Sequence, residues 1–393
     1  MRNWVKAAGL AAALALGMSG TALSQVQGVT DTEILIGSNG DLSGVFAAFN
    51  VQAIKAAQLY FDEVNKAGGI NGRKIRFIVE DHTYQLPKAQ QNFNKLVNSD
   101  KVFAMVLNLG TPHNIAGFQI MGPKKVANVS PLTAGRQMIE GDITYKYAGT
   151  SSYYDQLRMA IGYLAKEKKA TKICAMYFPQ DYGKEVHEGT MEAAKGDGLS
   201  FVAETVHRPD EQEFVGSVTK LREAGCQIIG IGLTPGQIPR VIGTAKQLGW
   251  TDVSFVGCSA GMHTVLAKVP GGIMEGYYAA SGWSDLENRM DNPTLKAWAE
   301  SFQKAYNEAP GTAAQLGYGA AATLVKGLEA AGKDLTPESF QKGMESLDFK
   351  DEINDTQVKY GADDHQGASD IVISQINGGK WVEVTRVDPS KSQ

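Results

Sequence analysis

Short apolar runs alternate with stretches of helical periodicity along the first part of the chain. Residues 33–37 form the first apolar run, and apolar positions at 54, 57, 61 and 64 then recur at helical spacing. Further apolar runs follow at 75–79, 102–107 and 126–129, and Pro87 opens a helix expected to end at about residue 98. This alternation predicts a parallel sheet flanked by helices.

The same alternation begins again after residue 150. Helices are expected at 155–168, 211–224 and 236–248, and strands at 172–178, 199–206, 227–233, 253–257 and 273–280. Because the two blocks have similar lengths, we expect two lobes of similar architecture, each with its own parallel sheet. The fold class is therefore α/β.

The last third of the chain adds helices and a hairpin. Helices are expected at 293–307, 312–331 and 337–347, and Asn377-Gly378-Gly379 between two apolar runs predicts a β-hairpin. Crossings between the lobes are expected near 149–152, 281–285 and 350–357. The expected first lobe comprises residues 28–149 plus 284–353, and the second comprises 150–283 plus 354–393.

The N-terminus has the pattern of a secretory signal peptide. Arg2 and Lys6 precede an apolar run at 7–18 that is too short to span a bilayer, and Ala22-Leu23-Ser24 forms a small-x-small cleavage site. We expect residues 1–24 to be removed; a buried N-terminal helix is the alternative. No later run reaches the roughly 18 apolar residues of a membrane span, so we expect a soluble, periplasmic protein without a lipid anchor.

Composition and charge narrow the possible partners. The 393 residues are 43% hydrophobic and 20% charged, with a formal net charge of −4. That balance offers no basic patch for nucleic acid. Cys174, Cys226 and Cys258 lie in or beside apolar runs, where buried, unreactive thiols are expected. Cys174 and Cys226 could also lie on neighbouring strands and pair.

Two common catalytic motifs are missing from the sequence. It contains no H-E-x-x-H pattern and no P-loop pattern. The glycine-rich run at 68–72 precedes a strand, which indicates a turn and not a phosphate site. Asp363-Asp364-His365 is better interpreted as a solvated loop than as a metal site. We therefore expect no catalytic residue, metal or cofactor, although a spatially assembled triad stays possible in principle.

The carboxyl ends of parallel strands face the ligand crevice in open α/β sheets. Thr111 and Thr133 lie at helix starts after such strands, where hydroxyl and backbone N–H groups can hold a carboxylate. Aromatic residues that could line the crevice are Phe46, Phe49, Tyr182 and Trp283. Each of these residues also has a structural interpretation, as a helix cap or a core side chain.

Several segments form a recognisable pattern. The most specific is Phe-Asp-Glu-Val-Asn-Lys-Ala-Gly-Gly-Ile-Asn-Gly-Arg at 61–73, accompanied by Leu42-Ser43-Gly44, Glu80-Asp81, Asp181-Tyr182-Gly183 and Gly317-Tyr318. In these segments the chain resembles the periplasmic Leu/Ile/Val-binding proteins, the type I solute-binding proteins of ABC importers. The resemblance covers nearly all of the chain after residue 24.

The resemblance implies a fold and a function. The fold would be the type I periplasmic binding protein fold, with two Rossmann-like lobes, parallel central sheets and three crossovers. The protein would trap a small ligand as the lobes close and, as a monomer, deliver it to the membrane permease of an ABC importer. A ligand sensor for a membrane receptor is the alternative; a hydrolase on the same fold is a weaker one.

The resemblance also assigns candidate ligand-binding residues. Phe49 matches an aromatic residue that covers the ligand, with Phe46 nearby, and Thr111 matches a hydroxyl residue that binds the ligand carboxylate. Leu132 and Thr133 fall in a loop that contacts the same ligand, and Tyr182 matches a tyrosine of the second lobe.

The chain departs from the family pattern at Ser259. Amino-acid-binding members usually place an acidic residue here to pair with the ligand ammonium, and a buried ammonium without a counter-charge costs several kcal/mol. Either Asp155, Glu185 or Asp285 supplies the missing charge, or the ligand has no ammonium. We favour the second interpretation, which predicts an aromatic or oxo acid as the small carboxylate ligand.

Overall fold

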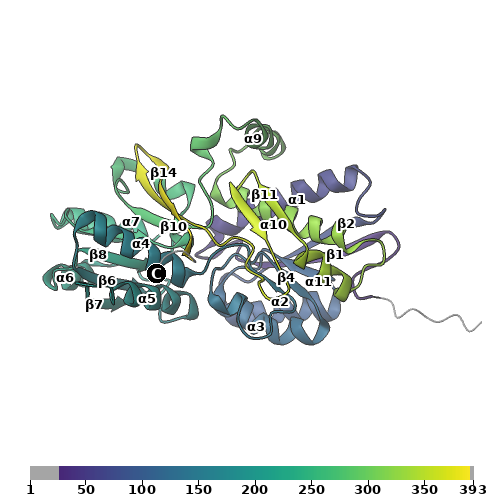
Figure 1. Ribbon diagram of the computed structural model, residues 1–393, viewed down its shortest axis with the longest axis horizontal. Helices are drawn as coiled ribbons and strands as arrows, with labels where there is room; N and C mark the ends of the chain where they lie inside the picture. Colours follow the sequence, from purple (N-terminus) through teal and green to yellow (C-terminus); the bar gives the residue numbers. More distant parts are fainter. Residues whose placement is uncertain (1–25, 390–393) are drawn as a thin grey trace, which may run out of the picture.

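The computed structural model describes residues 26–389, and the expected signal peptide at 1–24 lies outside this range. The described chain forms two lobes side by side, each built around a sheet with helices packed on it (Figure 1). No helix within the described range is both long and apolar enough to cross a membrane.

The first lobe contains a five-stranded sheet in the order β2-β1-β3-β4-β5, and all its strand pairs are parallel. Its strands are β1 Glu33–Gly40, β2 Lys74–Asp81, β3 Ala104–Val106, β4 Ala127–Val129 and β5 Lys146–Tyr147. The helices between them are α1 Ala47–Lys66, α2 Leu86–Asn94 and α3 Thr111–Met121. A turn with Gly69 at φ +73° joins α1 to β2, and a Cβ there would lie 2.1 Å from the Arg73 carbonyl oxygen.

The second lobe contains a seven-stranded sheet in the order β14-β13-β10-β9-β8-β6-β7. Its strands are β6 Lys172–Tyr177, β7 Ser200–Val206, β8 Ile228–Gly232, β9 Ser254–Gly257, β10 Tyr278–Ser281, β13 Ile371–Asn377 and β14 Lys380–Val387. Its helices are α4 Tyr153–Lys168, α5 Asp181–Ala193, α6 Val215–Glu223, α7 Ile238–Gln247 and α8 Thr264–Ala267. Strands β6 to β10 are parallel, and β13–β14 forms the predicted antiparallel hairpin. The predicted α/β class with two parallel-sheet lobes is confirmed.

After β10 the chain returns to the first lobe. This segment contains α9 Pro293–Tyr306, α10 Thr312–Ala331, α11 Pro337–Glu345 and the two-stranded sheet of β11 Asp348–Asp351 and β12 Thr356–Lys359. Helix α10 packs along α1 and α11.

The final crossing lies later in the chain than the boundary expected at residue 354. Val358 and Tyr360 belong to the hydrophobic core of the first lobe. His365, expected in a solvated loop, is buried against Tyr147, with ring centroids 4.5 Å apart, and its Nδ1 is bonded to the Ile143 and Lys146 carbonyls. The chain joins the second sheet only at β13, because these contacts hold residues 356–367 on the first lobe.

The structure decides between the two interpretations left open for Cys174 and Cys226. Cys174 lies in β6 and Cys226 just precedes β8, its neighbour in the sheet. The two residues form a disulfide with a Cα–Cα distance of 5.8 Å. Pairing across adjacent strands brings the Cβ atoms within bonding reach. Cys258 is a buried free thiol, as expected.

Candidate ligand-binding site

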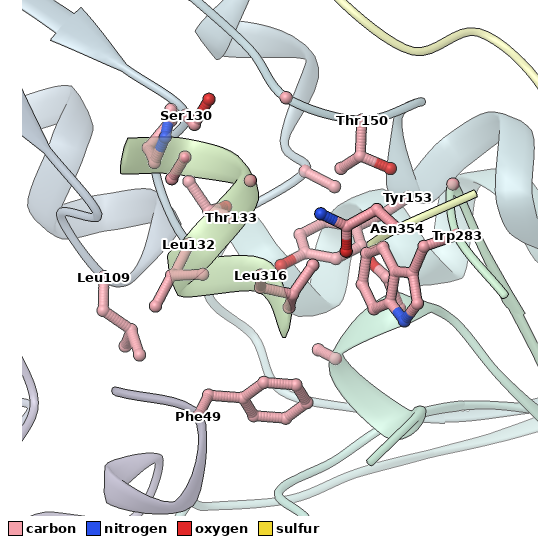
Figure 2. A pocket seen from close by; sticks show the side chains of 18 of the residues that line it. Phe49, Leu109, Ser130, Leu132, Thr133, Thr150, Tyr153, Trp283, Leu316 and Asn354 are labelled. Atoms are coloured by element: carbon pink, nitrogen blue, oxygen red, sulfur yellow. The ribbon is translucent and has the colours of Figure 1, made fainter. Parts of the chain in front are cut away.

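A cavity lies where the two lobes meet and has an empty volume of about 970 Å³, part of which is continuous with solvent. The predicted ligand-binding residues all line it: Phe46, Phe49, Thr111, Leu132, Thr133, Tyr182 and Ser259. Figure 2 shows Phe49, Leu132 and Thr133 around this space. The structure therefore brings the predicted residues together, while their contact with a ligand stays a prediction.

The hydroxyl end of the cavity is built from two loops. Gly110, at φ +96°, turns the chain from β3 into α3, so that Thr111 is the first helical residue. The Thr111 and Thr133 Oγ1 atoms lie 2.6 Å apart in a hydrogen bond, and both side chains are buried. A helix start carries unpaired N–H groups and a partial positive charge. One hydroxyl of the pair donates to the other, so the second O–H and the backbone N–H groups at the start of α3 can donate to a carboxylate without a basic side chain.

Aromatic rings form the wall beside this end. Phe46 contacts Tyr84 at a centroid distance of 4.8 Å and Tyr182 edge-on at 6.0 Å. Tyr182 packs on Tyr153 at 5.1 Å and donates its hydroxyl to the Leu233 carbonyl oxygen. Burial raises the pKa of Tyr182 well above its usual value, so the ring stays neutral. The wall is apolar and uncharged.

Two histidines lie directly behind the hydroxyl end. His82 and His113 stack with their ring centroids 4.4 Å apart, and His113 follows closely after Thr111 in α3. Burial lowers the pKa of His82 to about 4 and that of His113 to about 3. Both rings are neutral near pH 7 and add no positive charge for an anion.

Ser259 lies in a 3-10 turn after β9, and its backbone N–H donates to the Gln156 Oε1 atom at 2.8 Å. The three acids that could have supplied a charge here are bonded elsewhere. Asp155 pairs with Arg158, Glu185 pairs with Arg136, and Asp285 accepts from the Thr264 and Thr312 hydroxyls and the Glu287 N–H.

Asp351 is the acidic residue that the described cavity lining does contain, and sequence reasoning missed it. Its carboxylate accepts from the backbone N–H groups of Ile353 and Asn354 and from the Asn354 side-chain amide. Burial raises the pKa of this carboxyl. The Asp351 carboxylate therefore stabilises the turn at residues 351–354. No lysine, arginine or histidine lines the cavity within the described residues.

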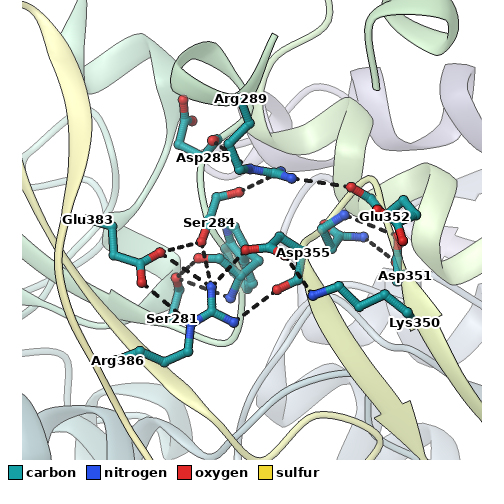
Figure 3. Close-up of polar contacts among 12 residues, drawn as sticks. Ser281, Ser284, Asp285, Arg289, Lys350, Asp351, Glu352, Asp355, Glu383 and Arg386 are labelled. Carbon is teal, nitrogen blue, oxygen red and sulfur yellow. Dashed lines mark hydrogen bonds and ion pairs between the residues drawn. The ribbon is translucent and has the colours of Figure 1, made fainter. Parts of the chain in front are cut away.

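A polar network holds the crossings beside the cavity (Figure 3). Arg386 on β14 donates to the Ser284 hydroxyl and the Asp355 carboxylate, both at 2.9 Å. Arg289 donates to the Ser284 and Ile353 carbonyls. These bonds tie the crossing at 281–285 to the turn that contains Asp351, next to Trp283 in the cavity wall.

The two lobes touch across the cavity mouth. Arg136 Nε lies 2.9 Å from a Glu185 carboxylate oxygen, and the same guanidinium contacts Glu188. The His263 Nε2 atom lies 3.0 Å from the Ala48 carbonyl oxygen. Phe46 and Phe49 of the first lobe belong to the hydrophobic core of the second. The lobes are in a closed arrangement.

Comparison with known proteins places the chain in a family. Residues 33–380 match the family model described as periplasmic binding protein. The chain belongs to the periplasmic binding protein family. Members of this family are binding proteins and not enzymes, and the Leu/Ile/Val-binding proteins are distant homologues of this member.

Relatives and solved structures agree with this assignment. An amino acid binding protein of Pseudomonas aeruginosa is 25% identical over 219 residues, which cover 55% of this chain and 59% of that protein. Leu/Ile/Val-binding protein homolog 1 of Brucella suis is 25% identical over 343 residues, which cover 86% of this chain and 90% of that protein. The structure of a fatty acid ABC transporter substrate-binding protein from Thermomonospora curvata superimposes on this chain with a TM-score of 0.85 at 27% identity. The superposition covers 94% of this chain and 96% of that chain.

Sequence reasoning missed several residues of the cavity lining. Tyr84 and Tyr153 add to the aromatic wall, and Leu316, Gly319, Ala320 and Thr323 of α10 line its far side. The spacing of the α10 residues, at i, i+3, i+4 and i+7, indicated one helix face. It could not indicate a cavity, because buried helix faces normally pack on other elements.

Proposed function

We propose that this family member is the extracytoplasmic receptor of a branched-chain-amino-acid-type ABC importer. It acts in the periplasm as a monomer after cleavage of its signal peptide. It traps a small carboxylate without an ammonium group between its closing lobes and delivers it to a membrane permease. Aromatic and oxo acids are the favoured candidates. Aliphatic acids are a further candidate class, because the similar protein from Thermomonospora curvata is described as a fatty acid transporter substrate-binding protein.

The proposal is carried by one observation about charge. The cavity joins a pair of threonine hydroxyls, one of them at a helix start, to aromatic rings, and Ser259 lies where the family resemblance leads us to expect an ammonium-binding acid. The acid in the described lining, Asp351, accepts three hydrogen bonds within its own turn. An ammonium group would therefore enter without a free counter-charge, which is costly in a buried site.

A binding panel tests the proposal. Purified protein is titrated calorimetrically with benzoate, octanoate, branched oxo acids, leucine and valine, and thermal shifts are recorded in parallel. We expect at least one acid without an ammonium group to bind. Its binding should be visible as a thermal shift, because a ligand at a hundredfold its dissociation constant adds about 2.7 kcal/mol of stability. Tight binding of leucine or valine, with no binding of the other acids, would refute it.

A further inference from the structure

The cavity continues beyond the cleft into the first lobe. Its inner part lies between α10 and β12 and is lined by Leu316, Ala320, Thr323, Val358 and Tyr360. We call this part the inner arm. In Figure 2, Leu316 projects from α10 between Phe49 and the group formed by Thr150, Asn354 and Trp283. The inner arm is thus continuous with the cleft that holds the predicted carboxylate-binding residues.

The side chains that line the inner arm keep a small exposed area. Ala320 and Thr323 of α10 line the cavity and are 4% and 3% exposed. Val358 and Tyr360, deep in the core of the first lobe, are each 4% exposed. All four residues line the cavity, so the inner arm is a space and not a fully packed contact.

Two polar groups beside the inner arm, the Tyr360 hydroxyl and the Asn354 amide, are bonded within the protein, whereas the Thr150 hydroxyl has no hydrogen-bond partner among the described residues. The Tyr360 hydroxyl donates to the Ala148 carbonyl oxygen at 3.0 Å. The Asn354 amide donates to the Asp351 carboxylate and to the Gln315 carbonyl oxygen. The inner arm therefore presents mainly hydrocarbon surface and offers no free charge to a second charged group.

A small residue keeps the inner arm wide. Ala320 faces the space with a single methyl group, so its side chain leaves room that a larger residue would fill. Gly319 instead makes room for the Asn354 side chain, because a Cβ at position 319 would lie 2.2 Å from the Asn354 amide nitrogen. Ala320 is therefore the position at which the width of the inner arm can be changed without disturbing the Asp351 turn.

We propose that the inner arm binds the hydrocarbon tail of the ligand. This inference rests on the proposed function and narrows its ligand class to monocarboxylic acids with an extended tail. The carboxylate lies at Thr111 and Thr133, the first carbons pass Phe49 and Leu316, and the tail lies between α10 and β12. Compact acids fill only the cleft and leave the inner arm empty.

A chain-length series measures the contribution of the inner arm. Full-length mature protein is titrated calorimetrically with butanoate, octanoate and dodecanoate. Burial of each methylene increases affinity about threefold to fourfold, so octanoate should bind about a hundredfold more tightly than butanoate. Equal affinities for butanoate and octanoate would overturn the inference and leave the proposed function standing. If neither these three acids nor any carboxylate without an ammonium group in the binding panel binds, both the inference and the proposed function are overturned.

A pair of variants locates the tail. Ala320→Leu fills the inner arm and should weaken octanoate about tenfold or more, while butanoate changes less than about threefold. Ala330→Leu makes the same change at an exposed position of α10 and should alter neither affinity. If Ala320→Leu does not fold, Val358→Ala widens the inner arm instead and should raise the dodecanoate-to-octanoate affinity ratio. An unchanged length dependence in the folded variants would overturn the inference.

Discussion

Thr111 and Thr133 place two hydroxyl groups within 2.6 Å of each other at the start of α3. Around them the wall is aromatic and carries no basic side chain in the described lining. A carboxylate held here depends on hydroxyl and backbone donors, and its affinity should be sensitive to single atoms. Hydrogen bonds to charged groups contribute about 1.5–3 kcal/mol each.

Thr111→Val removes one hydroxyl and keeps the shape of the side chain. We expect the acid that binds best in the panel to lose about tenfold to a hundredfold in affinity, because one charge-assisted bond is lost. Calorimetry measures the loss. Thr32→Val makes the same change at an exposed position and serves as the control. An unaltered affinity in Thr111→Val would show that this hydroxyl does not contact the ligand.

Ser259→Asp tests the absence of an ammonium-binding acid. The new carboxylate should give the protein measurable affinity for leucine or valine and weaken the best acid about tenfold, since two like charges then share a poorly hydrated site. Ser259→Asn keeps the size of the new side chain without its charge and should leave leucine unbound. The hypothesis fails if wild-type protein already binds leucine as tightly as Ser259→Asp.

At the level of elements, the turn from β3 into α3 supports the hydroxyl end of the cavity. His113 is the third residue of α3 and stacks on His82, which follows β2. Both ring nitrogens of His113 are buried and lack a close hydrogen-bond partner among the described residues. The His82 Nδ1 atom accepts from the Tyr84 N–H, and its Nε2 atom lies 3.1 Å from the Leu109 carbonyl. The stack holds α3 against the first sheet in a neutral form.

This stack predicts loss of stability in acid. The pKa values of His82 and His113 fall from about 6.5 in the unfolded chain to about 4 and 3 in the folded protein. The folded state prefers the neutral rings, so the contribution to stability is complete above pH 6.5 and declines as pH falls toward 4. His113→Phe keeps the stacked ring without the titration. Denaturant unfolding between pH 4 and 7 should show a weaker pH dependence in this variant.

The same comparison contains its own control. His187 is also stacked, on Tyr177, but it is partly exposed and hydrogen-bonded to Glu204. His187→Phe should therefore leave the slope between pH 4 and 6.5 close to that of wild-type protein. Equal slopes in wild-type protein and His113→Phe would contradict the assignment of acid sensitivity to the buried stack.

At the level of the whole molecule, the closed arrangement depends on a few contacts across the cavity mouth. Glu185 is only 2% exposed and faces Arg136 from the opposite lobe. Burial raises the pKa of Glu185, although its bonds to Arg136 oppose that shift. We expect opening of the lobes to return both charges to water, so that the pair stabilises the closed state alone.

Arg136→Met should shorten the lifetime of the closed complex. The change leaves the buried Glu185 carboxylate without its Arg136 partner in the closed state, and an unpaired buried charge is costly. We expect ligand dissociation, measured by stopped-flow fluorescence with the best acid of the panel, to accelerate about tenfold or more. Arg158→Met removes a pair within one lobe and should not change this rate. Equal rates in the three proteins would exclude a role of Arg136 in closure.

The alternation of strand and helix determined the α/β class, the two sheets and the terminal hairpin, because these features follow from local periodicity and turn chemistry. The loops after strands likewise indicated Thr111 and Thr133, since parallel strands end at one edge of their sheet. Ser259 was indicated only by the resemblance to the Leu/Ile/Val-binding proteins. The tertiary structure alone decided that Cys174 and Cys226 pair, that residues 356–367 stay on the first lobe, and that α10 and β12 leave a space between them. Each of these depends on contacts between segments far apart in the sequence, and no local pattern encodes the distance between such segments.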